Sequence, residues 1–194
     1  MKFLEVIHHF DKPWNLVTFA AWNKYPNENS PQVINVDILD RHMDPKTGVL
    51  HTERLFTCRQ NLPSIFEWFV GKDAVCYIRE VSEVDPKTKR MTLRSKNVTY
   101  ANLLTVEETC TYTEHEAETS TTRFTQQAVF SACGISLSSM QRKIEETCVA
   151  NFAKNAERGR QGLDQVIDSI ISGSRDLGHN LSALMETAAL TSSS

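Results

Sequence analysis

Six extended segments in the first two thirds of the chain are joined in pairs by connections that are too short for a crossover. Two of these connections, residues 44–48 and 85–88, begin with Asp-Pro, which is typical of tight turns. Strands connected in this way must run antiparallel. With one opening strand added, the expected strands are residues 3–9, 33–40, 49–58, 74–84, 90–99, 103–113 and 123–133.

Two helical segments flank these strands. The first has Pro13 in its first turn and ends at Pro26, whereas the second begins at Ser136 or Ser138 and keeps an apolar stripe as far as Ile171. The sequence therefore predicts an α+β fold, a curved seven-stranded antiparallel sheet packed on one long C-terminal helix and one short N-terminal helix. A long helix laid across a bent sheet leaves either a filled core or a cavity that holds a ligand.

Length and composition indicate one globular domain. We expect this domain to span residues 1–172 and a loosely attached, Ser/Thr/Ala-rich tail to follow at residues 173–194. A net charge of −3 argues against a nucleic-acid partner, which usually leaves a basic footprint. The chain has no run of about 20 apolar residues and no presequence pattern, so we expect a soluble protein made without a cleaved presequence.

No motif of a known catalytic or metal-binding type occurs in the chain. We expect no enzyme, no metal and no cofactor, although an enzyme that acts on lipids stays open because catalytic triads assemble from distant positions. The five cysteines are odd in number and widely spaced, so free thiols among apolar side chains are favoured over a disulfide or a metal site. They are Cys58, Cys76, Cys110, Cys133 and Cys148.

The connection at residues 60–72 is unusually apolar for a segment between two hairpins. Connecting segments normally run over the surface. This one is therefore either folded over the core or a lid that contacts a lipid or a membrane. The candidate lid and membrane-contact residues are Leu62, Ile65, Phe66, Trp68, Phe69 and Val70.

Polar residues interrupt the apolar stripe of the long helix at spacings of four, three and four, from Asn151 to Gly162. Either this face turns to solvent, or it lines a cavity and holds a phosphate-bearing headgroup. Basic residues near the strands support the second interpretation, and the alternation along its strand predicts that Arg54 faces inward. The candidate headgroup-binding residues are Lys24, Arg54, Arg59, Asn151, Asn155 and Arg158.

A series of short motifs follows in one order along residues 1–171. The motifs are Pro13-Trp14, Lys24-Tyr25-Pro26-Asn27, Val36-Asp37-Ile38-Leu39-Asp40-Arg41, Arg54-Leu55, Leu62-Pro63, Glu80-Val81-Ser82, Val84-Asp85-Pro86, Asn102-Leu103-Leu104, Val106-Glu107-Glu108 and residues 151–159. Together they resemble the PRELI-like family. Residues 37–42, 134–139 and 155–156 are most similar to its Slowmo-type branch.

The resemblance implies a lipid-transfer protein of the mitochondrial intermembrane space, with a lid loop over a lipid cavity. It implies an anionic phospholipid as cargo, transient membrane contact, and a small helical-hairpin partner that carries twin Cx9C motifs. The family's basic residue at the end of the first helix falls on Lys24, its lid on residues 62–72, and its asparagine and basic residue of the last helix on Asn155 and Arg158.

Two positions depart from the phosphatidic-acid branch, which has basic side chains where this chain has Cys58 and Asn151. Fewer fixed positive charges suit a headgroup with its own ammonium, so phosphatidylserine is favoured, with phosphatidic acid as the alternative. Arg59, one position away from Cys58, would supply the missing charge in that alternative. A lipid-binding adaptor without transfer activity is the remaining interpretation.

Overall fold

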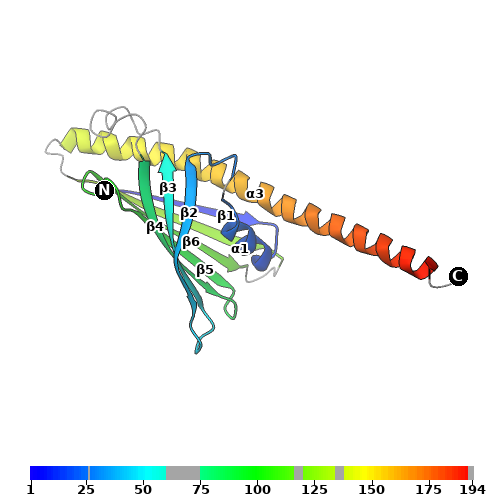
Figure 1. Cartoon of the computed structure of the whole chain (residues 1–194). Coiled ribbons are helices and arrows are strands. Elements are labelled where there is room, and N and C mark those ends of the chain that lie inside the picture. Colours follow the sequence, from blue (N-terminus) through cyan, green and yellow to red (C-terminus); the bar gives the residue numbers. More distant parts are fainter. Residues whose placement is uncertain (26, 60–74, 116–119, 134–137, 192–194) are drawn as a thin grey trace.

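The structure of the chain is a computed structural model, which describes residues 1–25, 27–59, 75–115, 120–133 and 138–191, with side chains as far as residue 174. Seven strands and two helices follow one another (Figure 1). They are β1 (Lys2–Phe10), α1 (Trp14–Trp22), β2 (Val33–Met43), β3 (Leu50–Arg59), β4 (Val75–Asp85), β5 (Arg90–Asn97), β6 (Leu104–Glu114), β7 (Thr122–Ala132) and α3 (Ser138–Thr191). These elements match the expected α+β fold, which is confirmed.

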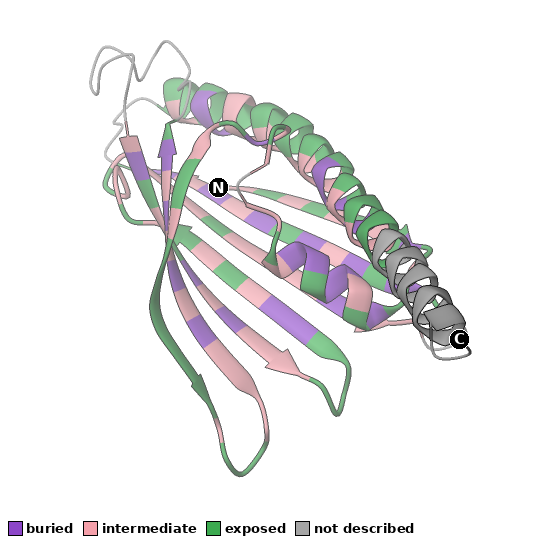
Figure 2. Ribbon diagram, turned by 45° about the vertical axis from the view of Figure 1, so that its right-hand side comes forward, coloured by how far each residue is buried: buried purple, intermediate pink, exposed green. Residues whose placement is uncertain are grey.

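The strands form one antiparallel sheet in the order β1-β7-β6-β5-β4-β3-β2. The sheet is curved. It does not close into a barrel, because β1 and β2 remain at its two edges. We call the face that α1 and α3 cover the inner face; Figure 2 shows buried and more exposed residues alternating along the strands. The alternation is complete from Thr52 to Cys58, where every second side chain is buried.

The core lies between α1 and the inner face. Pro13 precedes the first turn of α1, and Val17 and Ala20 in the helix are fully buried against the sheet. The indole of Trp14 donates a hydrogen bond to the carbonyl oxygen of Tyr112 at 3.1 Å. Met91 of β5 and Leu163 and Ile167 of α3 complete this apolar cluster, which fixes both helices on the sheet.

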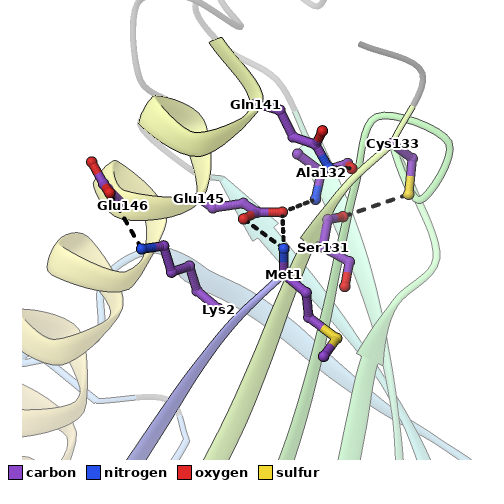
Figure 3. Close-up of polar contacts among 8 residues, drawn as sticks. All are labelled: Met1, Lys2, Ser131, Ala132, Cys133, Gln141, Glu145 and Glu146. Atoms are coloured by element: carbon purple, nitrogen blue, oxygen red, sulfur yellow. Dashed lines mark hydrogen bonds and ion pairs between the residues drawn. The ribbon is translucent and has the colours of Figure 1, made fainter. Parts of the chain in front are cut away.

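The beginning of α3 is tied to the sheet through one carboxylate (Figure 3). Glu145 is buried, and its two oxygens each lie 2.7 Å from the α-amino group of Met1. The backbone N–H of Ala132 donates to the same carboxylate at 3.1 Å, and Gln141 donates back to the carbonyl of Ala132. These contacts join α3 to β1 and β7, and they set the position of the helix over the inner face.

From its anchored start, α3 crosses the sheet and runs beyond it to Thr191 (Figure 1). The backbone of the segment expected as a separate tail from residue 173 therefore continues the helix. No helix among the described residues is both long and apolar enough to cross a bilayer.

Candidate functional site

A cavity of about 200 Å³ lies between the inner face of the sheet and α3. Strands β3 to β7 form its floor, the middle of α3 forms its roof, and the chain after α1 closes one side. Its aromatic lining residues include Phe10, Tyr112, Phe124 and Phe152. The remainder of the lining is polar or charged to an extent unusual for the inside of a protein.

A row of polar side chains crosses the floor of this cavity. Arg54 of β3 pairs in register with Glu80 of β4, Glu80 with Ser95 of β5, and Ser95 with Glu108 of β6. Gln126 of β7 extends the row, because its amide nitrogen donates to Glu108 at 2.6 Å. Residues directly opposite each other on one face of a sheet have neighbouring side chains, so register brings Arg54, Glu80, Ser95 and Glu108 together, and Gln126, which is opposite Cys110, reaches Glu108 diagonally.

At one end of the row, Arg54 and Glu80 form a buried ion pair. The guanidinium donates from Nε and Nη2 to Oε1 of Glu80, at 2.9 and 2.6 Å, and it lies 4.2 Å from the ring centre of Trp22. Burial raises the pKa of Glu80, and the charge and hydrogen bonds of Arg54 oppose that rise. Arg54 faces inward, as its strand alternation predicted, but its charge is already neutralised by Glu80.

Lys24 reaches the cavity from the segment that follows α1. Burial lowers the pKa of its ammonium, against the opposing influence of Cys110, Glu108 and Glu80. Among the described residues, no carboxylate forms an ion pair with it. The site therefore holds a sheltered cation without a direct counter-ion.

The space for the Lys24 ammonium depends on Gly159 of α3. A Cβ at that position would lie 2.9 Å from Nζ of Lys24, which is closer than real Cβ atoms come to other heavy atoms. Gly162 has a similar role near the next turn of the helix, where Asn27 donates to its carbonyl oxygen at 3.2 Å. At both glycines it is the chain between α1 and β2, through Lys24 and Asn27, that makes the close approach.

Arg160 provides a second cation at the roof of the cavity. Its Nη1 atom is buried and has no hydrogen-bond partner in the described part of the chain. On the floor, Oε1 of Gln126 is likewise buried without a partner. Buried polar atoms nearly always have partners, and unsatisfied ones often mark a water or ligand position.

The structure brings three of the six expected headgroup-binding residues to the cavity. Lys24, Arg54 and Asn155 line it. Asn151 and Arg158 are exposed on α3 and do not line it, and Arg59 is exposed at the end of β3. On α3 the helical period explains why two of these residues miss the cavity. Residues 152, 156, 159, 160 and 163 lie on the side of the helix that faces the sheet. Residues 151 and 158 lie about 100° or more around the helix axis from the centre of that side.

Sequence reasoning missed Glu80, Glu108, Gln126 and Arg160. A signal for Arg160 existed, because Phe152, Ala156, Arg160 and Leu163 continue the apolar stripe at spacings of four, four and three. The polar floor residues had no such signal, since their convergence depends on the register of five strands. No group of three or more His, Cys, Asp or Glu in the described ranges is arranged to hold a metal ion.

The candidate lid residues Leu62, Ile65, Phe66, Trp68, Phe69 and Val70 lie outside the described residues. All five cysteines are free thiols, as the sequence favoured, but Cys133 is exposed and not among apolar side chains as expected. Cys58 and Cys76 face each other across β3 and β4 in an apolar cluster, and burial raises the pKa of Cys58 to about 11. Cys110 lines the cavity, and burial raises its pKa as well.

Solved structures share the fold. The protein TTHA0849 of Thermus thermophilus covers 87% of this chain and 99% of its own, with a TM-score of 0.57 and 13% identity. The ZhuI aromatase/cyclase of Streptomyces sp. R1128 covers 88% of this chain and 95% of its own, with a TM-score of 0.58 and 9% identity. Likenesses at such low identity concern the fold alone.

Relatives in sequence are closer. "Protein UPS2, mitochondrial" of Saccharomyces cerevisiae is 41% identical over 86% of this chain and 73% of its own length. A "UPS-like protein" of Schizosaccharomyces pombe is 41% identical over 88% of this chain and 91% of its own. The "Protein slowmo homolog" of Dictyostelium discoideum is 35% identical over 96% of this chain and 79% of its own.

The Saccharomyces cerevisiae relative is mitochondrial by name, which agrees with the expected location, and the Dictyostelium discoideum relative agrees with the resemblance to the Slowmo-type branch. The model of the PRELI-like family matches residues 15–174, which include α1 apart from Trp14, the strands from β2 to β7 and the part of α3 above the cavity. The chain therefore belongs to the PRELI-like family of mitochondrial lipid-transfer proteins.

Proposed function

We propose that this protein carries single molecules of an anionic phospholipid, preferentially phosphatidylserine, between the outer and inner mitochondrial membranes. The observation that carries the proposal is a largely polar cavity between the sheet and α3, lined by the cations Lys24 and Arg160, with no direct counter-ion for Lys24 among the described residues. A phosphate group bound there would supply charge-assisted hydrogen bonds to both side chains.

The physical task explains why a carrier is needed. Moving a phospholipid through water exposes its acyl chains at about 0.8 kcal/mol per CH₂, so some thirty methylenes make a barrier of roughly 20 kcal/mol or more. A protein that shelters the lipid during the passage removes most of this barrier. It must release its cargo at the second membrane, so moderate affinity suits the function better than tight binding.

The cavity has the size of a headgroup. Pockets that enclose a drug-sized ligand measure about 300–1,000 Å³, and the cavity of about 200 Å³ is smaller than these. We therefore assign only the headgroup to it. The apolar segment at residues 62–72, which lies outside the described residues, is proposed from its sequence as the lid and membrane contact.

Several further features belong to the same proposal. The compartment is the intermembrane space, and a small helical-hairpin protein with twin Cx9C motifs is the partner. Phosphatidic acid is the alternative cargo, because Lys24 and Arg160 alone would serve a phosphate without an ammonium. We favour phosphatidylserine because the carboxylate of Glu108 also lines the cavity and has no ion-pair partner among the described residues.

A transfer assay between donor and acceptor liposomes tests the function. Labelled phosphatidylserine and phosphatidic acid are offered separately, with and without the hairpin partner. Replacing Arg160 by Gln should lower transfer about 10- to 100-fold, since a hydrogen bond to a charged group contributes about 1.5–3 kcal/mol. Arg158→Gln is the matched control, because Arg158 is exposed on the same helix two positions away and should leave transfer unchanged.

Each other outcome is informative. Normal transfer by the folded Arg160→Gln variant would remove the cavity from the mechanism. Phospholipid that co-purifies with the wild type without being transferred would indicate an adaptor. A headgroup-modified product after incubation with liposomes would indicate an enzyme instead.

A further inference from the structure

Some of the charged residues that line the cavity have no ion-pair partner among the described residues. Arg54 and Glu80 neutralise each other, whereas Lys24, Arg160 and Glu108 have no ion-pair partner within the described residues. These three charges line one cavity of about 200 Å³. Two unpaired cations and one unpaired carboxylate leave a net positive charge of one.

Neutral donors hold Glu108 in place. Gln126 donates to its Oε1 at 2.6 Å, and Cys110 and Ser95 approach its two oxygens at 3.3 Å each. Donors from three strands, β5, β6 and β7, fix the carboxylate on the floor. None of them carries a charge, so the negative charge of Glu108 remains available to a cation in the cavity.

Two further groups point to a bound polar molecule. Nη1 of Arg160 is a buried donor without a partner in the described ranges, and Oε1 of Gln126, beside Glu108, is a buried acceptor in the same condition. Gln126 is 8% exposed, so bulk water does not readily satisfy it. The cavity thus offers an unsatisfied donor at its cationic side and an unsatisfied acceptor at its anionic side.

We propose that Glu108 is a specificity-determining residue, whose carboxylate receives the ammonium group of the lipid headgroup while Lys24 and Arg160 hold the anionic groups. This inference rests on the proposed lipid-transfer function. A serine headgroup has one ammonium, one carboxylate and one phosphate, and it therefore matches one anionic and two cationic side chains. The acceptor Oε1 of Gln126 offers the ammonium a second hydrogen bond.

Phosphatidic acid would interact differently with the residues of the same cavity. It has no ammonium, so Glu108 contributes only repulsion of the phosphate and a partly buried negative charge without a cationic partner. Selectivity often comes from such an unfavourable group as much as from a favourable one. Glu108 should therefore weaken transfer of phosphatidic acid and strengthen transfer of phosphatidylserine.

The test is a comparison of lipids in the full-length Glu108→Gln variant. Gln keeps the shape and most hydrogen bonds but removes the charge. In competition from mixed vesicles, the ratio of phosphatidylserine to phosphatidic acid loaded or transferred should fall about tenfold, which corresponds to loss of one charge-assisted contact. Phosphatidylglycerol, which has the same net charge as phosphatidylserine but no ammonium, should gain relative to phosphatidylserine.

The matched control is Glu107→Gln. Glu107 precedes Glu108 on β6 but lies on the outer face, where Lys96 binds it at 2.7 Å. This variant should keep the wild-type lipid ratio. Glu108→Asp, which retains the charge, should keep a preference for phosphatidylserine even if the overall rate falls.

The possible outcomes distinguish the proposed role of Glu108 from the proposed lipid-transfer function. An unchanged ratio in folded Glu108→Gln, or an equal loss for all three lipids, would overturn the role of Glu108 while leaving lipid transfer intact. If the wild type transfers no lipid, the proposed function fails, and the loading ratio still decides whether Glu108 selects the headgroup. If the wild type neither loads nor transfers any lipid, both fail.

Discussion

The two faces of the sheet accommodate charged residues in opposite ways, although the residues concerned are neighbours in the sequence. Each of three strands carries two adjacent charged residues, the first on the outer face and the second on the inner face. The pairs are Glu53 and Arg54, Arg79 and Glu80, and Glu107 and Glu108. On the outer face every one of these charges has a partner, since Arg79 binds Glu53 and Lys96 binds Glu107. Of the three inner charges, Arg54 and Glu80 pair with each other, whereas Glu108 has no ion-pair partner in the part of the chain that the structure describes.

The difference indicates what each face is for. Exposed ion pairs contribute about 0–1 kcal/mol, so the outer face is a solvated surface whose charges balance locally. Buried charges are costly, and apolar side chains of similar volume often stabilise a core better. A sheet and two helices that only had to pack together would not need Glu108, Lys24 and Arg160 around one cavity, and their presence there supports a polar ligand.

The largest expected effect comes from breaking the inner pair. Arg54→Met leaves the carboxylate of Glu80 buried without its counter-ion, which should cost about 3–5 kcal/mol of unfolding free energy. Urea unfolding at a pH of about 7.5, well above the carboxylate's unfolded pKa, measures this loss. Arg79→Met, which breaks the exposed bidentate pair with Glu53 on the outer face of the same strands, should unfold close to the wild type.

The pH dependence of the Arg54→Met variant sharpens the same prediction. Burial raises the pKa of Glu80, and without Arg54 the main opposing charge is gone. An acid whose pKa is higher in the folded state costs stability where it is ionised, and this cost shrinks as the pH falls from the folded-state pKa to the unfolded pKa. The deficit of the variant should therefore shrink as the pH falls from about 7.5 towards the unfolded pKa of about 4.3. A constant deficit would show that lost packing, not the unpaired charge, causes it.

A substitution at Glu145 tests a buried carboxylate that has both an ion-pair partner and hydrogen-bond donors. Glu145→Ala removes the ion pair with the exposed Met1 ammonium and leaves the buried N–H of Ala132 without its acceptor. We expect a loss of about 2 kcal/mol, or a fall in melting temperature of about 4–8 °C. Glu146→Ala is the control, because Glu146 is exposed and pairs with Lys2 at 3.3 Å (Figure 3).

Acid should reduce the contribution of Glu145 to the unfolding free energy, because its pKa differs between the folded and unfolded states. Burial alone would raise the pKa of Glu145, but the hydrogen bonds from Met1 and Ala132 outweigh it and the pKa is lowered. The stability from Glu145 is therefore present above its unfolded pKa of about 4.3 and is lost as the pH falls through the folded value. The gap between wild type and Glu145→Ala should close in acid. A gap that did not narrow as the pH fell below about 4.3 would exclude the ionised carboxylate as its cause.

The sequence predicted the fold well because each strand pair carries its own local signal. Asp-Pro turns at residues 44–45 and 85–86 determine which neighbours pair, and Pro13 marks the beginning of α1. The strand bounds agree to within a few residues for the same reason. The end of α3 differed, because Ser, Thr and Gly lower helix propensity without stopping a helix that is already formed.

The site was predicted only in part, for reasons that lie in geometry. Arg54 was placed correctly on the inner face by strand alternation, but its pairing with Glu80 depends on the register of β3 and β4. On α3 the notable polar residues, Asn151 and Arg158, formed a face of their own, and that face is exposed. Which face of a helix meets the sheet follows from packing, and the buried stripe that includes Leu163 determines it.

The smallest expected effect comes from the outer face, where Lys96 and Glu107 are opposite each other on β5 and β6. Lys96→Glu alone places like charges together and should cost at most about 1 kcal/mol, less at high salt. The exchange Lys96→Glu with Glu107→Lys restores attraction and should recover wild-type stability in urea and wild-type transfer of both lipids. If the double variant were stable but slow in transfer, the outer face would have to contact a membrane or a partner. The contrast between an inner face that binds the lipid and an outer face that is merely solvated would then no longer hold.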